Sequence, residues 1–180
     1  MHEFADWLRE RLLTPRVALL AAVVLLAAVT AGALLPEVAT ALLLVAMIAQ
    51  FRLLDDLADR AYDRVHAAGR ALVSATDVRP VVVLLGGSIA AVVLGLGVLA
   101  GWARALAYLV LVACIIGLYA ALPSLGPRRA LRSGGVLLKY PAFVLLLAAA
   151  PASLRSSAVA LALYVVLAVH EWRDRRTGDA

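Results

Sequence analysis

Long apolar segments dominate this 180-residue chain and largely restrict it to a membrane. A transmembrane helix needs about 20 mostly apolar residues, with a usual range of about 17 to 25. Hydrophobic residues make up 64% of the sequence, which is more than an ordinary water-soluble domain contains. Six segments approach the length of a span, the last two being short: 17–35, 38–54, 80–100, 103–122, 136–150 and 154–169. The sequence therefore predicts an all-α protein, a polytopic transmembrane bundle of about six helices.

The basic residues predict the orientation of this bundle. Lysine and arginine are enriched on the cytoplasmic side of membrane proteins. With six spans, 15 of the 17 basic residues fall on the side that carries both termini, and only Arg104 and Arg155 fall on the other. We therefore expect both termini in the cytoplasm, at a bacterial inner (plasma) membrane. Contact with anionic lipid headgroups accounts for the net charge of +5, so we expect membrane lipids and no nucleic acid as partners.

The chain divides into a short N-terminal segment, one membrane domain and a polar tail. In residues 1–16, Phe4, Trp7, Leu8 and Leu12 share one helical face, which predicts an amphipathic helix at the membrane interface. Residues 17–172 form a single transmembrane helical domain, and residues 173–180 form the C-terminal tail. A signal peptide is the competing interpretation of the N-terminus, but its leading region is long and contains acidic as well as basic residues.

Four aspartates follow the second apolar segment, within the sequence QFRLLDDLADRAYDR at residues 50–64. On a helix, Asp55, Asp59 and Asp63 repeat at i, i+4 and i+8 and share one face, with Asp56 beside them. Like charges at this spacing repel one another. Mg²⁺ would remove the repulsion, since it binds a few carboxylates and takes its other ligands from water and substrate phosphates. The pattern predicts a Mg²⁺-diphosphate site on the cytoplasmic side.

The ordinary interpretation of the same segment is a solvated helix whose acids pair with neighbouring arginines. Arg52 and Arg60 each lie four residues from Asp56. Exposed pairs of this kind contribute only about 0 to 1 kcal/mol, which is a weak reason to gather acids on one face. Ionisable groups near membrane depth more often mark function.

These residues resemble a motif of a known family. The sequence DDLADRAYD at residues 55–63 is similar to the first aspartate motif of the UbiA-type intramembrane prenyltransferases, NDxxDxxxD, with Asp55 in place of the asparagine. Asp56, Asp59 and Asp63 occupy the three acidic positions. The continuation RVHAAGRALVS, with Arg64 and Arg70, is similar to the sequence that follows this motif in the family.

The resemblance implies a helical bundle in which Mg²⁺ holds a prenyl diphosphate between two aspartate-rich segments. The prenyl group would pass to an aromatic or lipid acceptor. Asp56, Asp59 and Asp63 would be the catalytic residues, and they would bind the metal together with Asp55. The second segment is expected after the sixth span, where the chain reads HEWRD at residues 170–174. The family prefers DxxxD there, so Asp174 keeps one ligand and Glu171 is a substitute for the other.

The chain departs from the family in length, because members usually have nine spans and this sequence predicts six. An open bundle would expose the bound isoprenoid to lipid. A homo-oligomer or a helper subunit would close it.

Basic residues should face the aspartates to stabilise the departing diphosphate. Lys139 is the single lysine beside sixteen arginines, and it stands in LLKYP at the cytoplasmic start of the fifth span. We expect Lys139, Arg64, Arg70 and Tyr140 to bind substrate. The arginines also suit the role of cytoplasmic membrane anchors.

Three other functions remain open. A non-catalytic protein that binds isoprenoid lipid, or a subunit of a larger membrane complex, would suit the short chain and the HEWRD segment. A CDP-alcohol phosphotransferase also has six spans, but its DGxxAR and GxxxDxxxD patterns are not met. Ion transport predicts acids in the middle of the spans, where this sequence has none. The first alternative depends on whether Glu171 and Asp174 face Asp59 and Asp63.

Overall fold

A computed structural model describes residues 7–66, 71–75, 77–121 and 135–178 of the chain. The described part is helical, which confirms the predicted all-helical class for these residues. The elements are η1 (Leu8–Leu12), α2 (Pro15–Thr30), α3 (Glu37–His66), α4 (Ala71–Ser74), α5 (Arg79–Ala100), α6 (Trp102–Ala121), α8 (Lys139–Leu147) and α9 (Leu154–Gly178).

Four helices are long and apolar enough to cross a membrane: α3, α5, α6 and α9. The first and fifth predicted spans form shorter apolar helices, Pro15–Thr30 and Gly135–Leu147. At about 1.5 Å per residue, the 16 residues of α2 extend roughly 24 Å, less than the ~30 Å hydrocarbon core of a bilayer. The helix ends early because Gly32 takes a φ of +82°, a left-handed conformation that glycine adopts at little cost.

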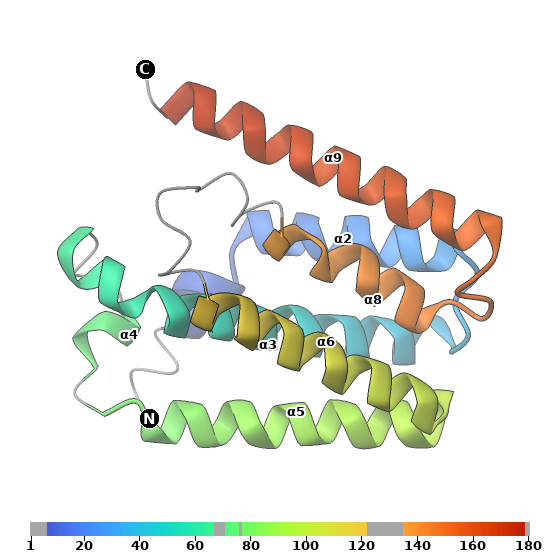
Figure 1. The fold of residues 1–180 in the computed structure, drawn as a ribbon, viewed down its shortest axis with the longest axis horizontal. Helices are drawn as coiled ribbons and strands as arrows, with labels where there is room; N and C mark the ends of the chain where they lie inside the picture. Colours follow the sequence, from blue (N-terminus) through green and yellow to red (C-terminus); the bar gives the residue numbers. More distant parts are fainter. Residues whose placement is uncertain (1–6, 67–70, 76, 122–134, 179–180) are drawn as a thin grey trace.

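Helix α3 is the central element and carries the aspartate segment. Its 30 residues contain no glycine or proline, so nothing interrupts the helix between the apolar span and the aspartates. It packs against α2, α5 and α8, while α9 packs outside α2 and α8. In Figure 1 the last turns of α3 and the end of α9 lie at the left of the bundle, and α8 runs from near the middle of the view toward the right-hand end.

At the opposite end, two turns are joined through backbone hydrogen bonds. The turn after α2 and the turn after α8 pair through Ala33 and Ala148, with Leu34 N donating to Leu147 O and Ala149 N to Gly32 O, both at 2.8 Å. Arg104, near the start of α6, donates to the carbonyl oxygens of Leu146 at 2.7 Å and Ala149 at 3.3 Å. This network fixes where α8 ends, and so supports the position of Lys139 at its other end.

Arg104→Gln should lower the free energy of unfolding by about 1.5 to 3 kcal/mol, the range for hydrogen bonds from a charged donor. The measurement is thermal or denaturant unfolding in detergent micelles. Arg155→Gln is the matched control, since Arg155 lies in the first turn of α9 at the same end of the bundle but is exposed. Equal effects of the two substitutions would contradict the proposed role of Arg104.

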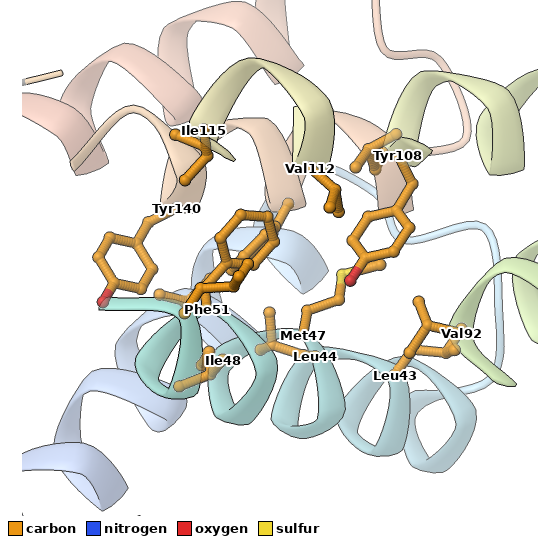
Figure 2. Packing of buried hydrophobic residues seen from close by; sticks show 14 of the residues in the cluster. Leu43, Leu44, Met47, Ile48, Phe51, Val92, Tyr108, Val112, Ile115 and Tyr140 are labelled. Atoms are coloured by element: carbon orange, nitrogen blue, oxygen red, sulfur yellow. The ribbon is translucent and has the colours of Figure 1, made fainter. Parts of the chain in front are cut away.

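The core beneath the aspartates is aromatic. Phe51, one helical turn before Asp55, packs against Phe143 of α8 with ring centroids 5.3 Å apart and edge-on against Tyr108 of α6 at 6.3 Å. Tyr140 packs edge-on against Phe143 at 5.9 Å. Figure 2 shows Phe51 among Tyr108, Tyr140 and the apolar side chains of α3. The rings pack α3, α6 and α8 together one helical turn before the aspartate segment.

The N-terminal segment packs onto the bundle. Within the described residues it begins at Trp7, which is 2% exposed, and continues as the π-helix η1. Leu8 and Leu12 pack against the core, and η1 contacts α2 and α3. Thr14 then caps α2 by accepting a hydrogen bond from Val17 N at 3.3 Å, with Pro15 in the first turn of the helix. Phe4, the remaining apolar residue of the predicted amphipathic face, lies outside the described residues.

Candidate functional site

The four aspartates lie in the second half of α3, in the predicted helical register. Asp56 and Asp63 are 7% and 5% exposed, while Asp55 and Asp59 are half-buried. Carboxylates that lose this much water need compensating charges or hydrogen bonds. The partners of Asp55 and Asp56 come from distant parts of the chain.

Asp55 is bound by α6 and α8. Its Oδ2 lies 2.5 Å from Nζ of Lys139, and its Oδ1 accepts a hydrogen bond from the Tyr119 hydroxyl. Sequence reasoning selected Lys139, and the structure brings it to the aspartate segment. It missed Tyr119, which lies 64 residues from Asp55 in a segment that reads only as an apolar span.

Lys139 is 1% exposed. Its ammonium nitrogen lies 5.8 Å from the ring centroid of Phe51 and 5.4 Å from that of Tyr140, within the range of cation–π attraction. The lysine ammonium group is therefore surrounded by the Asp55 carboxylate and two aromatic rings. Such surroundings hold the cation in one position beside the aspartates, and they also bring Tyr140 to the site.

Asp56 is bound by the N-terminal segment. Its Oδ2 accepts a hydrogen bond from the indole Nε1 of Trp7 at 2.8 Å. Nε of Arg11 donates to both carboxylate oxygens at 3.0 and 3.1 Å, and Nη2 of Arg11 also contacts Oδ1. The hydrogen bond to Asp56 raises the pKa of Arg11, against the opposing effect of burial, so this arginine stays charged.

Sequence reasoning missed both residues as site residues and assigned Trp7 to the membrane interface. Trp7 and Arg11 lie 49 and 45 residues from Asp56. The one signal in the sequence is that the two are four residues apart and therefore share a helical face.

The arginines within and after the aspartate segment take different positions. Arg60 holds α4 against α3, donating to Leu72 O at 2.9 Å and to Ala75 O at 2.6 Å. Arg64 is exposed. Arg70 lies outside the described residues. Among the predicted substrate-binding residues, the structure therefore brings Lys139 and Tyr140 to the aspartates.

Two further polar residues on α3 lie just before the aspartates. Gln50 is buried, and its Oε1 accepts a hydrogen bond from the Tyr108 hydroxyl. Within the described part of the chain, its Nε2 and the Nε of Arg52 are buried and have no hydrogen-bond partner. Buried donors without an acceptor are rare in folded proteins. These two N–H groups can therefore donate to a further acceptor beside the aspartates.

The predicted second segment lies at the end of α9. Glu171 is half-buried, and its carboxylate interacts electrostatically with Tyr140, as do Asp55 and Arg52. Tyr140 therefore lies in the fields of both acidic segments. The side chain of Asp174 lies outside the described part of the chain.

Comparison of the chain with protein-family models, with curated proteins and with solved structures gives no match. Among the described residues, no three His, Cys, Asp or Glu side chains gather as a set of metal ligands. A function must therefore be inferred from the four aspartates and the two cations paired with them, Lys139 and Arg11.

Proposed function

We propose that this protein is a membrane prenyltransferase of the UbiA type. It would transfer a prenyl group from a prenyl diphosphate to a lipid or aromatic acceptor in a Mg²⁺-dependent reaction. Six helices would be embedded in a bacterial inner membrane, the two shorter ones thinning the bilayer locally. The distribution of arginines supports a cytoplasmic position for the aspartate segment and both termini. Self-association or a helper subunit would cover the open side of the bundle.

The observation that carries this proposal is the buried Lys139 beside Asp55. Removing an ion pair from water costs several kcal/mol per ion, and apolar replacements are often as stable or more stable. Ionisable groups at membrane depth are by default functional. A fixed cation against an acidic helix face suits the binding of an anion together with its metal ion.

The donor set of α3 fits magnesium. Mg²⁺ binds through one or two carboxylates and completes its shell with water and phosphate oxygens. Asp59 and Asp63 are four residues apart on α3 and would supply those carboxylates, with Asp55 and Asp56 one turn earlier. The metal would neutralise charge on the departing diphosphate.

The residues of this chain would then do the remaining work by electrostatics and orientation. In the proposed reaction the bond between the allylic carbon and the diphosphate oxygen breaks, and the electron pair leaves with the diphosphate. The acceptor supplies an electron pair to the allylic carbon and loses a proton. Lys139 would stabilise the negative charge from a fixed position in a water-poor setting, where such interactions are strongest. The rings of Phe51 and Tyr140 keep water from this cation.

A second candidate function, a non-catalytic isoprenoid-lipid-binding protein, is favoured by one observation. Asp55 and Asp56, the first two carboxylates of the motif, are already held by Lys139, Tyr119, Trp7 and Arg11. If these pairs persist, the segment would bind a lipid headgroup without assembling a complete metal site.

The two functions are separated by following the bond that breaks. Protein in lipid nanodiscs is incubated with radiolabelled geranylgeranyl diphosphate, Mg²⁺ and a panel of aromatic and lipid acceptors. A transferase releases pyrophosphate and moves the label into a new lipid product. Binding of geranylgeranyl diphosphate without pyrophosphate release would support the non-catalytic function, and absence of both would contradict the proposal.

A further inference from the structure

Asp56 has its hydrogen-bonding capacity filled by the N-terminal segment. Its two oxygens receive four contacts: Oδ2 from Nε1 of Trp7, Oδ1 from Nη2 of Arg11, and each oxygen from Nε of Arg11, which lies between them. An ionised carboxylate offers about four lone-pair sites. A metal ion can therefore bind Asp56 only if one of these donors moves away.

Arg11 and Lys139 differ in how easily they can leave their carboxylates. The Arg11 side chain is 30% exposed, whereas that of Lys139 is 1% exposed. A departing Arg11 regains water at once, while a departing Lys139 would remain a buried cation without a counter-ion, which is costly. Arg11 is therefore the exchangeable member of the two pairs.

The segment that carries Arg11 is suited to a local rearrangement. Element η1 has five residues and is a π-helix, a rare conformation that occurs frequently at functional sites. Arg9 and Glu10 on its outer side are exposed. The partly exposed side chain of Arg11 can turn away from Asp56 while Trp7, Leu8 and Leu12 stay packed against the core.

We propose that Arg11 is the exchangeable counter-ion of the site: it pairs with Asp56 in the absence of ligand and with the diphosphate when a metal ion binds Asp56. This inference rests on the proposed function, because it assumes a diphosphate and a divalent ion at the aspartate segment. The planar guanidinium matches phosphate oxygens as well as a carboxylate. Arg11 would thus neutralise the charge of Asp56 in the ligand-free state and the charge of the diphosphate in the ligand-bound state.

The proposal predicts opposite effects of one substitution on two affinities. Arg11→Gln removes the competitor for Asp56, so Mn²⁺ alone, used as a spectroscopic probe for Mg²⁺, should bind at least fivefold more tightly by electron paramagnetic resonance. Geranylgeranyl diphosphate at saturating Mg²⁺ should bind at least fivefold more weakly by calorimetry. Arg9→Gln is the matched control, since it removes the same charge from an exposed position on the same segment and should change neither affinity by more than about twofold.

A second measurement follows the segment itself. In a Trp102→Phe, Trp172→Phe variant, emission comes from Trp7 alone. Adding Mg²⁺ with geranylgeranyl diphosphate should shift this emission, because the carboxylate that accepts the indole hydrogen bond exchanges the Arg11 guanidinium for a metal ion, whereas Mg²⁺ with geranylgeraniol should not.

Three outcomes would overturn the proposal. If Arg11→Gln weakens both affinities or leaves both unchanged, the exchange is wrong, and the proposed function still stands as long as the wild type binds the Mg²⁺-diphosphate. The same holds if that ligand binds without a change in Trp7 emission. If the wild-type protein binds neither Mn²⁺ nor the diphosphate, the exchange and the proposed function both fail.

Discussion

Lys139→Met should lower the free energy of unfolding by about 3 to 5 kcal/mol, the cost of removing one partner from a buried ion pair. The substitution leaves Asp55 half-buried beside Tyr119, with an apolar side chain where its cation was. It should also abolish binding of geranylgeranyl diphosphate, because the fixed cation of the site is lost. Unfolding in detergent micelles measures the first effect, and calorimetry in nanodiscs measures the second.

The double variant Asp55→Asn, Lys139→Met separates stability from function. An asparagine in place of Asp55 removes the uncompensated charge and keeps an acceptor for the Tyr119 hydroxyl, so most of the lost stability should return. Diphosphate binding should not return. Recovery of both properties in the double variant would mean that Lys139 serves only to neutralise Asp55.

Asp59→Asn should reduce Mg²⁺-dependent diphosphate binding by about 100-fold or more, since even the outer neighbours of metal ligands alter affinity by about 10- to 100-fold. The fold should survive, because Asp59 is half-buried and asparagine has nearly the same shape. Calorimetric titration with geranylgeranyl diphosphate at fixed Mg²⁺ gives the affinity.

Glu37→Gln is the control for this substitution. Glu37 is exposed and begins the same helix at its other end. Its substitution therefore removes the same charge far from the site. We expect wild-type affinity for Glu37→Gln. If Asp59→Asn also leaves the affinity unchanged, Asp59 is not a ligand of the metal ion.

Periodicity and helix-breaking residues were enough to predict the local structure around the aspartates. An uninterrupted apolar run predicts the span in α3, and the spacing of four predicts the register of Asp55, Asp59 and Asp63. The unusual single lysine pointed to Lys139, and the need for a cation near the acids predicted its direction. These inferences depend on residues close in sequence or on one simple charge argument.

The remaining partners depend on tertiary packing and leave little trace in the sequence. Tyr119 lies in an apolar span, and only the packing of α6 near α3 and α8 brings its hydroxyl to Asp55. Trp7 and Arg11 reach Asp56 because η1 folds back over α3. The first and fifth helices end a few residues before the predicted spans do, because apolar composition continues past the points at which Gly32 and the extended backbone of Ala148 end the helices.

The most direct test of a Mg²⁺-diphosphate site is calorimetric titration of geranylgeranyl diphosphate into the wild-type protein in nanodiscs, once with Mg²⁺ and once with EDTA. The proposed site predicts saturable binding with Mg²⁺ and an affinity at least about 100-fold lower with EDTA, since the aspartate face would then repel the diphosphate. Equal affinities under the two conditions, or no binding under either, would contradict it.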